Sequence, residues 1–147
     1  MIFYPINLNI KNRKCVIVGG GKVAERKAKN ILSFDGKVKI ISPELTTGLR
    51  KLYRTKKIRY VKLEYSPDML KGAFLVYAAT SQRKVNAQIA RDAKRLGILV
   101  NVADSAKDSS FILPAIMRKK KSVISVSTNG KSPSLAKRIR DEIKVIL

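Results

Sequence analysis

Apolar segments and helical patterns alternate along the chain up to Asp104. Short apolar or alternating segments indicate β-strands, and they cover residues 14–18, 37–41, 58–65, 73–80 and 98–104. Between them, apolar residues at helical spacing indicate helices over residues 23–32 and 44–54 and from Val85 to Leu96. Strands separated by helices pair in parallel through right-handed crossovers. The pattern therefore predicts an α/β fold with a Rossmann-like, doubly wound parallel sheet.

The pattern changes after Asp104. Two short strand patterns surround the basic turn Arg118–Lys121, and a last helix pattern begins at Ser132 and Pro133, which suit the N-cap and the first helical position. This tail is too small for a core of its own. We therefore expect a main domain over residues 1–112 and a small strand-and-helix segment over residues 113–147. The segment could close over the main sheet or pair with a second copy of the chain. Because its second strand would otherwise present an unpaired edge, we expect this segment to mediate dimerisation.

An apolar strand runs directly into three glycines and then into a helix pattern, in the stretch CVIVGGGKVAERKA at residues 15–28. Gly19, Gly21 and Ala24 match the spacing G-x-G-x-x-A. The glycines allow a tight turn and the close approach of a pyrophosphate, and the small third residue lets the helix pack on the strand. The helix N-terminus adds free N–H groups. The turn predicts dinucleotide binding, with a purely structural glycine turn as the alternative.

The carboxyl ends of the other strands predict further cofactor contacts, because these ends line the crevice of a parallel sheet. The second strand ends at Ser42, where an acid that binds the adenosine ribose is often found. Glu44 can supply that acid or can be an ordinary acid of the next helix, so the pattern does not separate NAD from NADP. Thr80 and Ser81 follow the fourth strand and can also cap a helix. The predicted cofactor contacts are Gly19, Gly20, Gly21, Lys22, Val23, Ala24, Ser42, Pro43, Thr80, Ser81 and Asn101.

Asp104 follows the fifth strand at the same edge of the predicted sheet. A carboxylate there is either a solvated loop acid or a catalytic group. The sequence has no histidine and one cysteine, so an acid–base step must use Asp, Glu, Lys, Tyr or the substrate itself. A structural zinc site is excluded on the same grounds, and we assign no metal ligand. Cys15 lies within an apolar strand, where we expect a buried, inert thiol.

The chain is strongly basic, with 32 Lys and Arg against 10 Asp and Glu and a net charge of +22. Such a charge attracts nucleic acid, an anionic membrane or a polycarboxylate, and a solvated surface is the alternative. The aromatic content is 6%, without an aromatic-studded sheet motif, which disfavours nucleic acid. No apolar run reaches the length of about 18 residues that a membrane span needs. The N-terminal stretch lacks the pattern of a secretory signal, so we expect a cytoplasmic protein.

Four stretches together resemble the N-terminal part of siroheme synthases, the precorrin-2 dehydrogenase family, whose members often also act as sirohydrochlorin ferrochelatases. They are FYPINLNIKNRKCVIVGGGKVAERKA, GAFLVYAATSQRKVN, VNVADSAKDSSFILPA and ISVSTNGKSPSLAKRIRDEI, and they span most of the chain, from Phe3 to Ile143. The resemblance implies oxidation of precorrin-2 to sirohydrochlorin with NAD as the hydride acceptor. Many members then insert Fe²⁺. It also implies that Asp104 is the acid–base group and that the chain forms a homodimer.

The resemblance implies a function for the basic charge, because precorrin-2 is a polycarboxylate that positive charges attract. Thr128, Asn129 and Lys131, at a helix start, are the substrate candidates, and a capped loop is the alternative reading of the same residues. Longer family members continue beyond the position of Leu147 with a helical segment over the cleft. We therefore expect either a shortened chain or a minimal member with a more open cleft. A nucleotide-sensing module that binds NAD(H) without catalysis is the competing function.

Overall fold

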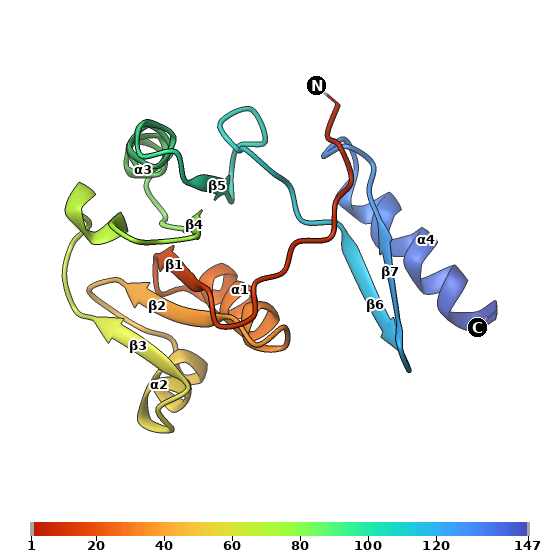
Figure 1. Ribbon diagram of the computed structural model, residues 1–147, viewed down its shortest axis with the longest axis horizontal. Helices are drawn as coiled ribbons and strands as arrows, with labels where there is room; N and C mark the ends of the chain where they lie inside the picture. Colours follow the sequence, from red (N-terminus) through yellow and green to blue (C-terminus); the bar gives the residue numbers. More distant parts are fainter. Residues whose placement is uncertain (1, 147) are drawn as a thin grey trace. The chain divides into compact units, whose positions relative to one another are not determined.

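The computed structural model describes residues 2–146 and holds a five-stranded parallel sheet and a two-stranded antiparallel sheet (Figure 1). Contacts divide the chain into a large unit, Ile6–Ser110, and a small unit that combines the residues up to Pro5 with those from Phe111 onward. The large unit contains β1 Lys14–Val18, α1 Lys22–Leu32, β2 Lys37–Ile41, α2 Thr47–Arg54, β3 Ile58–Val61, the 3₁₀ helix η1 Pro67–Leu70, β4 Leu75–Ala78, α3 Arg83–Arg95 and β5 Leu99–Val102. The small unit contains β6 Ala115–Lys119, β7 Ser122–Val126 and α4 Pro133–Ile146.

The parallel sheet has the strand order β3-β2-β1-β4-β5, which confirms the predicted doubly wound arrangement. Neighbouring side chains on a strand point to opposite faces of the sheet. On one face, Val76 and Val100 pack in a buried cluster with Ile89 of α3. On the other face, Lys27 of α1 contacts Tyr77, the residue next to Val76. Helices α1 and α3 therefore cover opposite faces, and the sheet is buried between them.

Cys15 of β1 is fully buried, as the apolar strand predicts. Burial raises the pKa of its thiol to about 11, because the low-polarity surroundings disfavour the thiolate. A thiol with so high a pKa is protonated at neutral pH and is a poor nucleophile.

Two predicted element boundaries differ from the structure by three residues or more. Strand β3 ends at Val61 instead of residue 65, because Val61 pairs with Ile41, the last residue of β2, and no partner strand continues beyond that pair. Helix α2 begins at Thr47, not at Glu44. The Thr46 hydroxyl accepts a hydrogen bond from the Leu49 amide at 3.2 Å, and this N-cap fixes the helix start. Glu44 and residues 62–66 are consequently loop residues at the carboxyl edge of the sheet.

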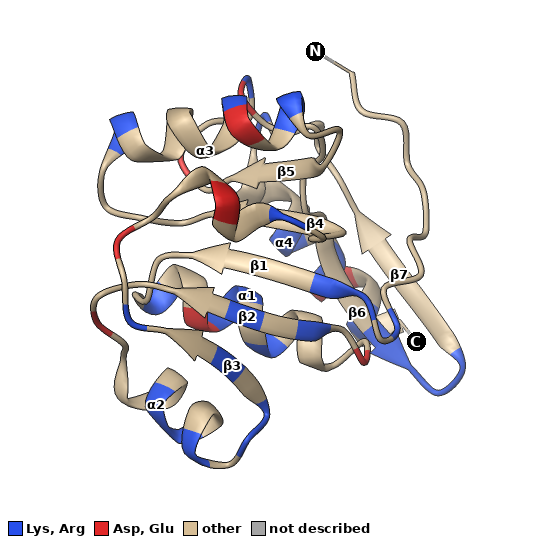
Figure 2. Ribbon diagram, turned by 60° about the vertical axis from the view of Figure 1, so that its left-hand side comes forward, with Lys and Arg blue, Asp and Glu red and all other residues tan. Residues whose placement is uncertain are grey.

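In the small unit, β6 and β7 form an antiparallel hairpin whose tip carries the basic turn Arg118–Lys121 (Figure 2). Helix α4 contacts both strands. The Ser132 hydroxyl accepts a hydrogen bond from the Leu135 amide at 3.3 Å, which confirms Ser132 as the N-cap and places Pro133 at the first helical position.

The basic residues are distributed over both units (Figure 2). Lysines or arginines occur on all four α-helices and at the tip of the β6–β7 hairpin. Among residues 2–146, no helix is both long enough and apolar enough to cross a lipid bilayer.

Candidate dinucleotide site

A cleft of about 540 Å³ lies at the carboxyl edge of the parallel sheet, wholly within the large unit. We call it the sheet-edge cleft. Its walls come from the segments that follow β1, β2, β3 and β4 and from the first turn of α3. The lining residues are 18–21, 41–46, 63–65, 79–82 and Val85. This is the place where open α/β sheets bind their ligands.

The glycine turn shapes the floor of the cleft. Gly19 has a φ of 121°, and a side chain there would overlap the carbonyl oxygen of Ala79. A side chain at Gly20 would overlap the carbonyl oxygen of Glu44 and would lie 2.8 Å from the Ser42 hydroxyl. The backbone segments after β1, β2 and β4 therefore meet at a spacing that only glycine allows.

Gly21 differs from its two neighbours. It is the N-cap of α1 with φ −84°, and apart from Gly21 itself and its two chain neighbours no atom of residues 2–146 lies within 4 Å of the position that its side chain would take. The open space therefore lies directly before the first turn of α1, whose amide groups have no carbonyl partner within the helix. These amides and the positive end of the helix dipole attract an anion. The turn thus fits the pyrophosphate of a dinucleotide.

The loop after β2 is held to α1. Ser42 is 9% exposed and lies in the cleft wall with Pro43 and Glu44. The Thr46 hydroxyl donates a hydrogen bond of 2.6 Å to the Glu25 carboxylate, which also pairs with Lys29. The bonds from Lys29 and Thr46 hold the pKa of Glu25 below its ordinary value. Glu25 thereby fixes the loop that carries Ser42, a role that the sequence pattern did not reveal.

The loop after β4 is fixed by a buried amide. Asn86 is 1% exposed, and its side-chain oxygen accepts hydrogen bonds from the Thr80 amide at 3.1 Å and the Thr80 hydroxyl at 2.7 Å. Its amide nitrogen donates back to the Thr80 carbonyl at 3.1 Å. The N-cap of α3 is Gln82, so Thr80 and Ser81 precede the helix and line the cleft instead. Asn86 was missed because a polar residue within a helix pattern gives no local signal.

Asp104 lies within the turn that follows β5, two residues after Val102. The Ala103 amide donates to the Ala78 carbonyl at 2.9 Å, which keeps this turn beside the end of β4. The Asp104 side chain is 41% exposed and lies 3.8 Å from the Arg83 guanidinium. Arg83 begins α3, directly after the cleft wall, and also pairs with Asp108. Asp104 is thus a partly exposed carboxylate at the same sheet edge as the cleft, next to a cation that the sequence analysis did not single out.

The structure places Asn101 away from the cleft wall. It is 7% exposed, and its side-chain oxygen accepts a hydrogen bond of 2.7 Å from the Lys27 ammonium. In the sheet it pairs with Tyr77, whose ring lies 5.1 Å from the same ammonium. Asn101 does not line the sheet-edge cleft, because its side chain points to the face covered by α1, and its contact with the cofactor stays a prediction. Its observed partner is a buried lysine.

The remaining predicted cofactor contacts have separate places on α1. Ala24 is fully buried and packs α1 on the sheet, which is the role of the small residue in the motif. Lys22 and Val23 are exposed and form the first helical residues beside Gly21. Residues 63–65 line the cleft although the sequence pattern placed them within a strand. The rule that strand ends line the crevice would have identified them had the end of β3 been located correctly.

The substrate candidates lie in the small unit, in the loop between β7 and α4. The Thr128 hydroxyl accepts from the Ser132 amide at 3.0 Å and donates to the Ser132 carbonyl at 2.9 Å. The side-chain oxygen of Asn129 accepts from the Phe3 amide at 3.1 Å. The Lys131 amide donates to the Thr128 carbonyl at 3.0 Å. Thr128 and Asn129 thus shape the loop, and their contact with a substrate stays a prediction.

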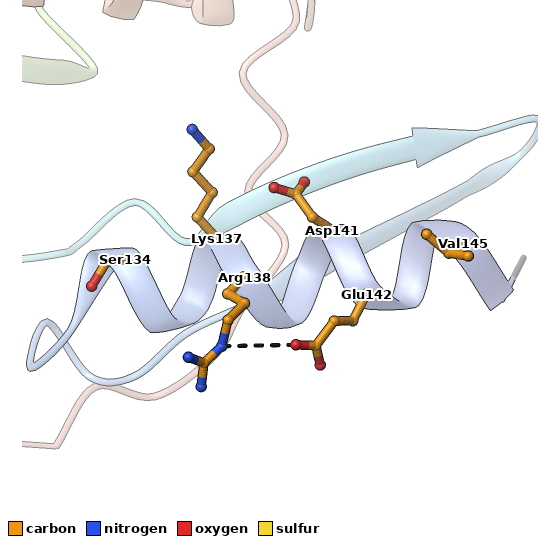
Figure 3. Close-up of a pocket in the computed structure, with 6 residues that line it drawn as sticks. All are labelled: Ser134, Lys137, Arg138, Asp141, Glu142 and Val145. Atoms are coloured by element: carbon orange, nitrogen blue, oxygen red, sulfur yellow. Dashed lines mark ion pairs between the residues drawn. The ribbon is translucent and has the colours of Figure 1, made fainter.

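A second hollow lies along α4 in the small unit. Its lining residues all belong to this one helix, and Arg138 and Glu142 form an ion pair of 3.7 Å across it (Figure 3). Figure 3 also shows Lys137 and Asp141 directed outward from the same helix. Charged side chains of both signs along one helix are typical of a solvated surface.

The buried side chain of Lys27 should make the free energy of unfolding depend on pH. Burial, with a smaller contribution from Arg26, lowers the pKa of Lys27 from 10.5 to about 8. Below pH 8 the lysine is protonated in both the folded and the unfolded chain. Between pH 8 and 10.5 the unfolded chain binds more protons, so the free energy of unfolding rises with pH.

We expect urea unfolding to show this rise against the variant Lys27→Met. From pH 8 to pH 10 the wild type should gain about 2 kcal/mol relative to the variant. Lys51→Met, at an exposed position on α2, controls for the loss of one positive charge. A difference between wild type and Lys27→Met that stays constant from pH 7 to pH 10 would show that the ammonium is not buried as described.

The fold and the cleft define a dinucleotide-binding domain. The comparison with protein-family models agrees: a model described as putative NAD(P)-binding matches residues 6–115. The chain belongs to this family of NAD(P)-binding domains. A second model, described as the central part of a sirohaem biosynthesis protein, matches residues 124–145 in the small unit.

The chain is similar in sequence to siroheme synthases, as its motifs predict. It is 37% identical to siroheme synthase 3 of Aeromonas hydrophila over 147 residues, which are 100% of this chain and 31% of that protein. It is 38% identical to the siroheme synthase of Nitrosomonas eutropha over 150 residues, again 100% of this chain and 31% of that protein. The chain therefore spans about a third of the length of these relatives.

Solved structures support the fold. SirC, a precorrin-2 dehydrogenase, matches with a TM-score of 0.83 and 26% identity over 99% of this chain and 71% of that chain. GenD2 from gentamicin A biosynthesis, solved in complex with NAD, matches with a TM-score of 0.50 and 17% identity over 69% of this chain and 29% of that chain. At this low identity, the second likeness shows the fold alone.

Proposed function

We propose that the chain catalyses the NAD⁺-dependent oxidation of precorrin-2 to sirohydrochlorin. The observation that carries the proposal is the open space before α1, at the same sheet edge as the Asp104 carboxylate. The likeness to siroheme synthases and to a precorrin-2 dehydrogenase is the basis for proposing precorrin-2 as the substrate. Precorrin-2 loses a hydride and a proton, and the nicotinamide ring of the bound cofactor accepts the hydride.

The residues of the chain bind the cofactor, orient it toward the substrate and accept a proton. The first-turn amides of α1 hold the pyrophosphate, and Ser42 offers a hydroxyl to the adenosine ribose. Thr80 and Ser81 line the cleft on the side of Asp104, within the loop that Asn86 fixes. Asp104 accepts the proton that leaves the substrate, since a carboxylate can act as a general base without a histidine.

Several positive charges favour an anionic substrate. The net charge of +22 raises the local concentration of a polycarboxylate and steers it to the protein. Thr128, Asn129 and Lys131 are the proposed substrate contacts. The small unit is the proposed homodimer contact, because among residues 2–146 no third strand pairs with its two-stranded sheet and Val123 is half exposed.

Insertion of Fe²⁺ into sirohydrochlorin is a second reaction that the likeness to siroheme synthases suggests. Among residues 2–146, no three His, Cys, Asp or Glu side chains cluster in a way that would hold a metal ion. If the chain carries out this reaction, Asp104 is the candidate acceptor for the pyrrole protons.

One assay tests these proposals in turn. The chain is incubated with precorrin-2 and either NAD⁺ or NADP⁺, and absorbance spectra follow the reduced cofactor and sirohydrochlorin. Fe²⁺ is then added. We expect NADH and sirohydrochlorin in equal amounts with NAD⁺. Binding of NAD⁺ without any product would instead favour a nucleotide-sensing module.

A further inference from the structure

Tyr65 lies in the wall of the sheet-edge cleft, in the segment that follows β3. Leu63, Pro43 and Val85 line the same cleft and give this part of it an apolar surface. An aromatic ring among aliphatic side chains is a suitable surface for a flat heterocyclic base.

The strand order indicates which base this is. Pro43 and Leu63, which line the cleft together with Tyr65, follow β2 and β3 on one side of the central β1, whereas Asp104 follows β5 on the other side. A dinucleotide whose pyrophosphate lies at the central β1 turn directs its two bases to opposite sides. The reacting nicotinamide belongs on the side of Asp104, so the adenine belongs on the side of Tyr65.

A buried carboxylate holds the Tyr65 ring. Asp92 of α3 is 2% exposed, and its Oδ2 accepts a hydrogen bond of 2.9 Å from the Tyr65 hydroxyl. Gln88 donates to both carboxylate oxygens at 3.0 Å, and Arg95 pairs with Oδ1 at 3.1 Å. A buried carboxylate is stable only when it is hydrogen-bonded in this way. Burial, and then the bond to Asp92, raises the pKa of Tyr65 above its ordinary value, so the hydroxyl stays a donor.

We propose that Asp92 is a positioning residue that fixes the Tyr65 ring as one wall of the adenine pocket. The inference rests on the proposed function only in that the chain must bind a dinucleotide at the glycine turn. A ring that is already fixed loses little conformational freedom when the base binds against it, so the tether increases affinity. The bond joins residues 27 positions apart in the sequence and links the β3 loop to α3.

Calorimetric titration with ADP-ribose tests this assignment, because that probe contains the adenine and the pyrophosphate without the nicotinamide. Tyr65→Leu removes the ring and should weaken ADP-ribose binding by about tenfold. Tyr65→Phe keeps the ring but removes the tether, and Asp92→Asn weakens the same bond, so each should weaken binding by about threefold. Tyr53→Phe, on α2 and outside the cleft lining, is the matched control and should bind as the wild type does.

A double variant separates positioning from a general structural role. If Asp92 acts through Tyr65, Tyr65→Phe combined with Asp92→Asn should bind no more weakly than either single variant. In the dehydrogenase assay, Tyr65→Phe and Asp92→Asn should each raise KM for NAD⁺ and leave kcat unchanged. Should Asp92→Asn fail to fold, Tyr65→Phe and Tyr65→Leu still decide the matter.

The possible failures are distinguishable. A wild-type chain that does not bind ADP-ribose would overturn the proposed function itself. Wild-type binding with unchanged affinity in Tyr65→Leu would overturn the adenine assignment alone. Losses in affinity that add in the double variant would show that Asp92 does not act through Tyr65.

Discussion

Gly21→Ala is expected to leave the fold intact and to weaken NAD⁺ binding by about 10- to 100-fold. The backbone of Gly21 has an ordinary conformation, and its side-chain position is open, so an added methyl group meets no atom of residues 2–146 beyond its own chain neighbours. The same methyl group would occupy the space where the pyrophosphate approaches the α1 amides. Loss of one or two charge-assisted hydrogen bonds accounts for a change of this size.

Gly19→Ala is the matched control, with the opposite expected outcome. Its φ of 121° disfavours any side chain, and the methyl group would overlap the Ala79 carbonyl. We expect it to lower the free energy of unfolding by about 2 kcal/mol or more. Thermal unfolding and calorimetric titration of both variants check the pair. If Gly21→Ala binds NAD⁺ with wild-type affinity, the pyrophosphate does not lie at this turn.

Asp104→Asn is expected to lower kcat for precorrin-2 oxidation by about 10²- to 10⁴-fold while the affinity for NAD⁺ is retained. The substitution keeps the shape of the side chain and removes the proton acceptor. NAD⁺ affinity should not change, because Asp104 does not line the sheet-edge cleft. Steady-state kinetics, together with titration of NAD⁺, measure the two quantities separately.

Asp108→Asn provides the control for Asp104→Asn. Asp108 pairs with the same arginine, Arg83, and this pairing holds the pKa of the Asp108 carboxyl below its ordinary value. Substitution of Asp108 therefore removes a carboxylate from the same local cluster without removing the proposed base. We expect its kcat to stay within about threefold of the wild type. Equal losses in the two variants would indicate that the cluster is structural and that Asp104 is not the base.

The sheet and its central turn could be predicted because their signals are local. Buried parallel strands give continuous apolar runs, and the glycine turn lies between a strand and a helix within a few residues. The Ser132 cap was also predictable, since N-capping depends on a hydroxyl three residues before the amide that it binds.

Other features depend on contacts between distant residues and gave no local signal. The alternating pattern over residues 58–65 continued beyond Val61, but β2 offers no partner past Ile41. Leu63 and Tyr65 continue the alternating pattern, but they line the cleft and do not belong to a strand. Asn101 was expected near the cofactor, but its partner is Lys27, which lies 74 positions away in the sequence. No pattern within a short window reveals such a pair.

The most direct test of this account is a crystal structure of the chain with NAD⁺. We expect the pyrophosphate before the first turn of α1, with its oxygens about 3 Å from the amide nitrogens beside Gly21. We also expect the adenine against Tyr65. A pyrophosphate bound anywhere else on the protein would contradict the account.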